Sequence, residues 1–127
     1  MLQTVLLVED EPGIAGLLRD VLEDEGYAVL VATDGVTGLC RVRTEHPDLL
    51  LSNIQMPQMS GADMVRAIRA ESAFDGMPII LMSAAAALGE GVPSDGFFEK
   101  PFPLDALIAT VARLLDLARA PVHSPGG

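Results

Sequence analysis

Cysteine is nearly absent from this sequence, which contains a single thiol, Cys40. With no second cysteine and no metal-ligand residues grouped around it, Cys40 supports neither a disulfide framework nor a thiolate metal site. An unpaired cysteine is typical of proteins in a reducing compartment. The chain also begins directly in a strand-like apolar run, without the features of a signal peptide, so we expect a cytoplasmic location.

Basic residues are also few: 8 Lys and Arg stand against 18 Asp and Glu, for a formal net charge of −10. Phosphate contacts need clustered Lys and Arg, so this balance argues against nucleic-acid binding by the domain. It argues equally against binding to anionic membrane surfaces. A run of about 18 apolar residues is also missing, so a transmembrane helix is not expected. The acid excess by itself indicates only a solvated surface.

What the sequence does contain is a regular alternation of apolar patterns. The 127 residues, half of them apolar, suffice for one domain with one hydrophobic core. Short apolar runs alternate with segments of helical periodicity, which is the pattern of a parallel sheet built from β-α units. The predicted strands are residues 5–8, 27–32, 49–52, 77–82 and 96–99.

Helix signals fill the intervals between these strands. Pro12 suits the first position of a helix that Gly26 ends, and Asp34 can cap a second one. A third helix is predicted over residues 63–71, and Pro103 opens a last one with a continuous apolar stripe. We therefore predict one α/β domain over residues 1–119, a five-stranded doubly wound sheet with helices on both faces. Residues 120–127 are predicted to form a disordered tail.

Polar side chains follow four of the predicted strands, where a doubly wound sheet places its ligand site. Glu9 and Asp10 follow the first strand, Asn53 the third, Ser83 the fourth and Lys100 the fifth. Each has an ordinary explanation alone: acids favour the positive end of a helix, serine caps helices, and lysine is common in exposed loops. Together, at one edge of one sheet, they indicate a functional site.

These residues lie within stretches that together resemble one family, the receiver domains of two-component response regulators. The matching stretches are VLLVEDE (5–11), PDLLLSNIQMP (47–57), MSG (59–61), PIILMSA (78–84) and FFEKPF (97–102). The resemblance spans about residues 3–118, and residue type agrees in every stretch except at residue 53. It implies a flavodoxin-like fold with the strand order 2-1-3-4-5.

The resemblance further implies that a histidine kinase transfers a phosphoryl group to an aspartate at the end of the third strand. Such a transfer brings negative charges together, and a divalent metal screens them. Glu9 and Asp10 match the acidic pair that holds Mg²⁺, and Gln55 matches the residue whose backbone carbonyl binds the same ion. Oxygen ligands of this kind suit Mg²⁺.

The other matched positions belong to the response to phosphate. Lys100 matches the lysine that pairs with the phosphoryl oxygens, and its bond to Pro101 matches one that is usually cis in the family. Ser83 matches the hydroxyl that bonds a phosphoryl oxygen and moves toward it on activation. Phe97 matches the aromatic residue whose rotation reports this movement.

Asn53 occupies the acceptor position itself. Its neutral amide is a very poor nucleophile and cannot form the acyl phosphate, and the loss of one negative charge should weaken Mg²⁺ binding. Three accounts of Asn53 are open: a natural residue, a deliberate substitution, or deamidation to aspartate, which the β-branched Ile54 should slow. The first is favoured because no other position looks altered.

Two surrogate acceptors are disfavoured. Adjacent residues on a strand point to opposite faces, so the hydroxyl of Ser52 should point away from the pocket. Asp10 is a poor nucleophile while it holds a metal ion.

The stretch between Ser83 and Lys100 is shorter than is usual for the family. Residues 84–93 (AAAALGEGVP) favour one helical turn followed by a breaker, so we predict that the helix between the fourth and fifth strands is truncated or replaced by a loop. In the family this region commonly mediates dimerisation and output. We therefore expect a monomer or weak dimer, with output through another face; the alternative is a tolerated surface trim.

We predict a stand-alone receiver domain in two-component phosphorelay signalling, atypical at Asn53, with a histidine kinase or other signalling protein as its partner. The alternative is a phosphorylation-independent pseudo-receiver that acts as a protein-interaction module. An enzyme is not expected, because neither GxxxxGK nor GxGxxG occurs. A flavodoxin-type cofactor binder is disfavoured because aromatic residues make up only 4% of the chain and no Ser/Thr/Gly-rich loop follows the first strand.

Overall fold

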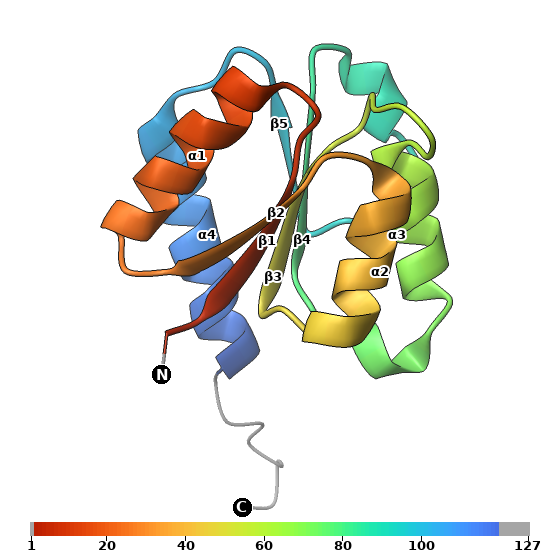
Figure 1. Cartoon of the computed structure of the whole chain (residues 1–127), viewed down its shortest axis with the longest axis horizontal. Helices are drawn as coiled ribbons and strands as arrows, with labels where there is room; N and C mark the ends of the chain where they lie inside the picture. Colours follow the sequence, from red (N-terminus) through yellow and green to blue (C-terminus); the bar gives the residue numbers. More distant parts are fainter. Residues whose placement is uncertain (1, 120–127) are drawn as a thin grey trace, which may run out of the picture.

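Five parallel strands form one sheet in the order β2-β1-β3-β4-β5 in the computed structural model of the chain, which describes residues 2–119 (Figure 1). This confirms the order that the family resemblance implied. The predicted tail, residues 120–127, lies outside the described residues. The strands are β1 (Thr4–Val8), β2 (Ala28–Ala32), β3 (Leu49–Asn53), β4 (Ile79–Ser83) and β5 (Gly96–Glu99).

Alternate side chains of the central strands build two separate hydrophobic layers. Leu7 and Leu51 pack on the side of α1 (Pro12–Asp24) and α4 (Leu104–Arg119). Leu6 and Leu50 pack on the side of α2 (Gly35–Glu45) and α3 (Gly61–Arg69). Figure 1 shows the two helix pairs on opposite faces of the sheet. Because the central strands are covered on both faces, they appear in the sequence as unbroken apolar runs.

The helices begin at the signals that the sequence carries. Pro12 begins α1, where the Glu11 side chain accepts hydrogen bonds from first-turn backbone N–H groups. Asp34 caps α2 as predicted, and its carboxylate accepts a 2.8 Å hydrogen bond from the backbone N of Thr37. A 3-10 turn, η1 (Ser72–Phe74), precedes β4. Across residues 2–119, none of the helices is long and apolar enough to cross a membrane.

Several predicted boundaries were wrong. Strands β3 and β4 extend to Asn53 and Ser83, so these two residues belong to the strands and do not follow them. Helix α3 begins at Gly61 and not at Asp63, because Ser60 caps it: the Ser60 hydroxyl accepts a 3.1 Å hydrogen bond from the backbone N of Asp63. The Ser60 cap therefore sets this start two residues earlier than the apolar pattern indicates.

The connection from β4 to β5 contains a single 3-10 turn, η2 (Ala86–Gly89), and no α-helix. This confirms the predicted truncation. Gly89 lies directly against the ring of Phe97, since a Cβ added at Gly89 would lie 2.7 Å from the ring carbon Cδ2. A larger residue at this position would therefore have to displace the ring.

Asp95, the last residue of this short connection before β5, bonds it to β4 and α3. Its carboxylate accepts hydrogen bonds from the backbone N of Ile79 at 2.8 Å and from Nη2 of Arg69 at 3.0 Å. Arg69 also donates to the carbonyl of Phe74 at 2.8 Å. The Arg69 side chain is only 18% exposed, so this pair is better shielded from water than an ordinary surface pair.

Replacing Asp95 with alanine should destabilise the domain by about 1–3 kcal/mol, because the N–H of Ile79 and the Arg69 guanidinium both lose their acceptor. Urea unfolding measures the change. The control is Arg66→Ala, which removes the exposed ion pair with Asp63 and should cost less than about 1 kcal/mol. Equal stability of the two variants would contradict the role assigned to Asp95.

Candidate functional site

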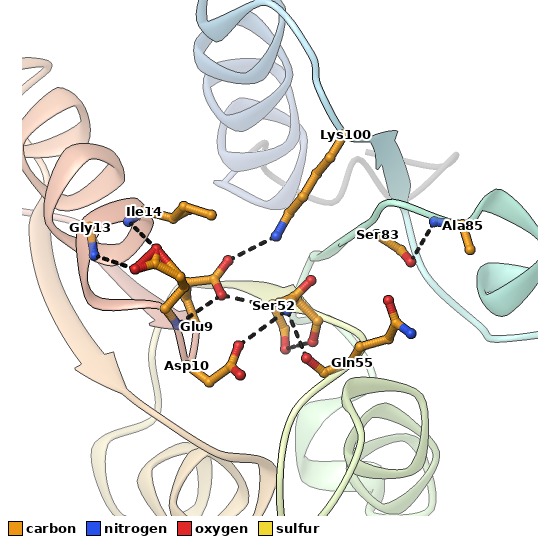
Figure 2. A network of polar contacts seen from close by, with 11 residues as sticks. Glu9, Asp10, Gly13, Ile14, Ser52, Gln55, Ser83, Ala85 and Lys100 are labelled. Atoms are coloured by element: carbon orange, nitrogen blue, oxygen red, sulfur yellow. Dashed lines mark hydrogen bonds and ion pairs between the residues drawn. The ribbon is translucent and has the colours of Figure 1, made fainter.

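Most of the predicted site residues meet at one edge of the sheet, at the carboxyl ends of β1, β3 and β4 (Figure 2). The strand register explains the meeting. Val8 pairs with Ser52, so Glu9, the residue after Val8, comes beside Asn53. The backbone N of Lys100 donates to the carbonyl of Ser83 at 2.8 Å, which brings the end of β5 to the same edge.

Glu9 is the most deeply buried charged group of the site, with 1% of its surface exposed. Its Oε1 lies 3.0 Å from Nζ of Lys100, which reaches across the site toward it in Figure 2. Its Oε2 accepts from the backbone N of Glu11 at 3.2 Å. A carboxylate removed from water needs such partners, and Lys100, the only lysine in the sequence, supplies the charge.

The carboxamide of Asn53 faces the acidic side of the site. Its Nδ2 donates to the backbone carbonyl of Gln55 at 2.9 Å, to Oδ1 of Asp10 at 3.4 Å and to Oε2 of Glu9 at 3.5 Å. Reversing the amide would place its oxygen against three other oxygens, so the hydrogen-bond network defines this orientation. The shortest of the three bonds also ties Asn53 to the loop that follows it.

These residues do not fit a divalent metal as they are arranged. Two carboxylates and a carbonyl, from Glu9, Asp10 and Gln55, are suitable oxygen ligands. Asn53, however, presents N–H groups to them, and an N–H donor cannot ligate a cation. Residues 2–119 contain no group of three or more His, Cys, Asp or Glu side chains placed to hold an ion.

Ser83 is fully buried beside this cluster, and its hydroxyl is engaged with the following loop. The hydroxyl accepts a 3.0 Å hydrogen bond from the backbone N of Ala85, which Figure 2 shows apart from the Glu9–Lys100 pair. The Lys100–Pro101 bond is cis, as the resemblance implied.

Phe97 does not join the polar cluster. It packs with the hydrophobic layer on the α2–α3 side of the sheet, and it pairs in register with Leu81. Its ring lies against Gly89 in η2.

Ser52 points away from the pocket, in agreement with the strand alternation. Leu50, two residues before it, belongs to the α2–α3 layer, whereas Leu51 belongs to the opposite layer. The buried Ser52 hydroxyl donates to the carbonyl of Asn53 at 2.9 Å. The hydroxyl thus fixes the backbone of the acceptor position and does not face the acids.

Gly61 is a further residue of the site, in a matched stretch, whose role was not predicted from the sequence. A Cβ added at Gly61 would lie 2.2 Å from the carbonyl oxygen of Asn53. Only a glycine permits this approach of α3 to the end of β3. The signal available in the sequence was the glycine directly after the Ser60 cap.

Gly61→Ala should therefore displace Asn53 and destabilise the domain by more than about 1 kcal/mol. Gly16→Ala is the matched control, because nothing lies within 4 Å of the Cβ position in the interior of α1. That control should be neutral or stabilise by about 0.5–1 kcal/mol. Thermal unfolding of both variants tests the difference, and a Gly61→Ala variant as stable as Gly16→Ala would refute the contact.

The backbone geometry opposes deamidation of Asn53. Ring closure requires the backbone N of Ile54 to attack the Asn53 side chain, but this nitrogen donates to the carbonyl of Met82 at 2.9 Å within the sheet. The nucleophile is therefore withheld wherever the sheet is intact.

We expect that the folded chain shows no deamidation at residue 53 during prolonged incubation at neutral pH, whereas the chain unfolded in denaturant does. Asn53 is the only asparagine in the sequence, so peptide mapping by mass spectrometry reads this site without interference from another asparagine. Equal rates in the folded and unfolded chains would contradict the protection.

Comparison with known proteins agrees with the observed fold. The family model "Response regulator receiver domain" matches residues 5–112. Hybrid signal transduction histidine kinase D of Dictyostelium discoideum is 37% identical over 123 residues, which cover 91% of this chain and 8% of that protein. DNA-binding response regulator MtrA of Mycolicibacterium smegmatis is 38% identical over 120 residues, which cover 90% of this chain and 51% of that protein. The chain thus spans about half the length of one relative and a small part of the other.

Solved structures are similar over nearly the whole chain. Chemotaxis response regulator CheY4 of Vibrio cholerae has a TM-score of 0.82 and 29% identity, covering 90% of this chain and 99% of its own. The receiver domain of sensor histidine kinase PA1611 from Pseudomonas aeruginosa PAO1 has a TM-score of 0.84 and 27% identity, covering 91% and 98%. That structure has a magnesium ion coordinated in its active-site cleft. Because the family model matches residues 5–112 and the fold agrees with it, the chain belongs to the response regulator receiver domain family.

Proposed function

We propose that the chain is a receiver domain of a two-component system that does not accept a phosphoryl group at residue 53. The observation that carries this proposal is the buried Asn53 carboxamide, which occupies the acceptor position beside Glu9 and Asp10. An amide nitrogen has its electron pair delocalised into the carbonyl, and the amide oxygen carries no full charge. Neither atom attacks phosphorus at a useful rate.

The surrounding residues keep the types that phosphoryl chemistry needs. In this proposal Lys100 is the group that would neutralise phosphoryl oxygens, and Ser83 and Phe97 are the switch positions. In the structure each of these groups contacts another residue of the same chain. Lys100 pairs with Glu9, the Ser83 hydroxyl accepts from the backbone N of Ala85, and the Phe97 ring lies against Gly89. The proposed resting state is therefore one in which these three groups are already engaged.

We further propose that Mg²⁺, which PA1611 holds in its active-site cleft, binds weakly here. Its ligands would be Glu9, Asp10, the carbonyl of Gln55 and the side-chain oxygen of Asn53, which would face the ion only after the carboxamide turned over. The ion would supply charge screening between an acceptor and a phosphoryl group. Asparagine in place of aspartate removes one negative charge from this set, and charge count is a main determinant of affinity for such cations.

The proposed partner is a histidine kinase or another signalling protein, and the proposed location is the cytoplasm. Neither nucleic acid nor a membrane is proposed as a partner of this domain. The acidic net charge of −10 and the unpaired, exposed Cys40 support this assignment. We propose that residues 1–119 act as one non-enzymatic domain. The short η2 turn, in place of a helix, favours a monomer or weak dimer.

A second candidate is a pseudo-receiver that works only as a protein-interaction module. It is favoured because every buried side-chain polar atom among residues 2–118 already has a hydrogen-bond partner. An apolar groove of about 400 Å³ beside Lys100, lined by Ile14, Leu17, Phe102 and Leu104, adds a surface for a partner protein. This candidate differs from the first in one respect: it does not need a competent phosphate pocket.

The two candidates are separated by restoring the acceptor. Incubated with acetyl phosphate and Mg²⁺, the parent chain should keep its intact mass, and Asn53→Asp should gain one phosphoryl group. Asn53→Asp combined with Lys100→Ala should gain much less, because the charge that stabilises the transfer is missing.

Each other outcome has a definite meaning. A folded Asn53→Asp variant that stays unmodified would favour the interaction module. A phosphoryl group on the parent chain would overturn the proposal, and peptide mapping would then identify the acceptor.

A further inference from the structure

Three oxygens converge on one nitrogen at the centre of the site. The Nδ2 atom of Asn53 lies within hydrogen-bond distance of Glu9 Oε2, Asp10 Oδ1 and the carbonyl oxygen of Gln55, at 3.5, 3.4 and 2.9 Å. These are the oxygens matched to the metal ligands of the receiver family. The amide N–H group therefore lies where they converge.

The oxygen cluster needs positive charge from some source. Lys100 pairs with Oε1 of Glu9, whereas Asn53 donates to the other oxygen of that carboxylate, Oε2. Among the described side chains of residues 2–118, Asp10 forms no ion pair with an arginine or with Lys100. The two carboxylates of the cluster are thus balanced by a single ammonium group, that of Lys100. One negative charge remains uncompensated beside the amide.

We propose that the Asn53 carboxamide takes the place of the divalent cation, so that this receiver pocket is assembled without metal. The polarised N–H bonds give the three oxygens a donor, which lowers their mutual repulsion without adding a full charge. The inference deepens the proposed function, on which it rests, because it explains how the pocket keeps its geometry when residue 53 carries neither a carboxylate nor a phosphoryl group.

The amide and a cation exclude one another at this point. A cation would require the amide to turn over and present its oxygen, with the loss of all three N–H contacts. The amide oxygen presented in this way is neutral, whereas the unphosphorylated aspartate of a receiver that accepts phosphate brings a negative charge. Both effects act against the metal, so Mg²⁺ affinity should be at least about tenfold lower in the parent chain than in Asn53→Asp.

The first test is thermal unfolding with a chelator and then with saturating Mg²⁺. The parent chain should unfold at nearly the same temperature in both. Asn53→Asp brings three carboxylates together, so in chelator it should unfold about 4 °C or more below the parent chain, and Mg²⁺ should restore the loss. Asn53→Ala removes the donor without adding charge, so it should be less stable than the parent chain in chelator.

Gln3→Glu is the matched control for net charge, because it adds a carboxylate at the opposite end of β1 from the site. It should respond to Mg²⁺ as the parent chain does. A parent chain that gains as much from Mg²⁺ as Asn53→Asp would overturn the inference. So would an Asn53→Ala variant as stable as the parent chain in chelator.

A second test reads the amide directly and needs no substitution. Since Asn53 is the only asparagine in the sequence, selective ¹⁵N-asparagine labelling gives one side-chain NH₂ signal. The two protons should be well separated and exchange slowly, and Mg²⁺ that saturates Asn53→Asp should leave them unchanged. A single averaged signal, or a shift at that concentration, would contradict the inference.

The inference and the proposed function fail separately. Phosphoryl uptake is measured by mass, whereas metal substitution is measured by unfolding and by the amide signal. A parent chain that resists acetyl phosphate but is strongly stabilised by Mg²⁺ would refute the inference alone.

Discussion

The pairing of buried Glu9 with Lys100 is the constraint on which the site depends. Glu9 directly follows β1 and has 1% of its surface exposed, and Lys100 directly follows β5 on the far side of β3 and β4. Removing one partner of a buried ion pair costs about 3–5 kcal/mol in proteins, because a charge is left in a poorly solvated place. The Lys100 side chain therefore ties the loop after β5 to the end of β1, across the carboxyl ends of β3 and β4.

Because the polar groups of the site already bond to one another, a change of state needs a source of free energy that replaces these bonds. In a two-state protein, a ligand shifts the equilibrium only by the difference between its affinities for the two states. A phosphoryl group provides that difference in an ordinary receiver by drawing the lysine and the hydroxyl toward itself. Here Lys100 and Ser83 are already bonded to other groups of the same chain. Under the proposed function Asn53 takes no phosphoryl group, and the free energy for a change of state would then come from a protein bound at the surface.

The sequence predicted the features that depend on local chemistry. Apolar runs marked the strands, Asp34 marked a cap, and the glycines and proline of residues 84–93 marked the shortened connection. It could not predict the direction of the Asn53 amide or the bond from Ala85 to the Ser83 hydroxyl. Asn53 and Glu9 are far apart in the chain, and sequence spacing does not specify the orientation of one side chain toward a distant one. The strand ends were misjudged for a related reason, since polar residues can complete a strand when a neighbour pairs with them.

Asp95 determines more than the stability of the short connection. Its backbone N donates to the carbonyl of Ile79 at 2.8 Å, while its side chain accepts from the N–H of the same residue at 2.8 Å. Both polar groups of the first residue of β4 are thus bound by a single residue next to β5. A shift of β5 by one position would break both bonds at once and would turn each β5 side chain to the wrong face. With no helix between these two strands to restrict their alignment, one aspartate sets the register of the edge strand.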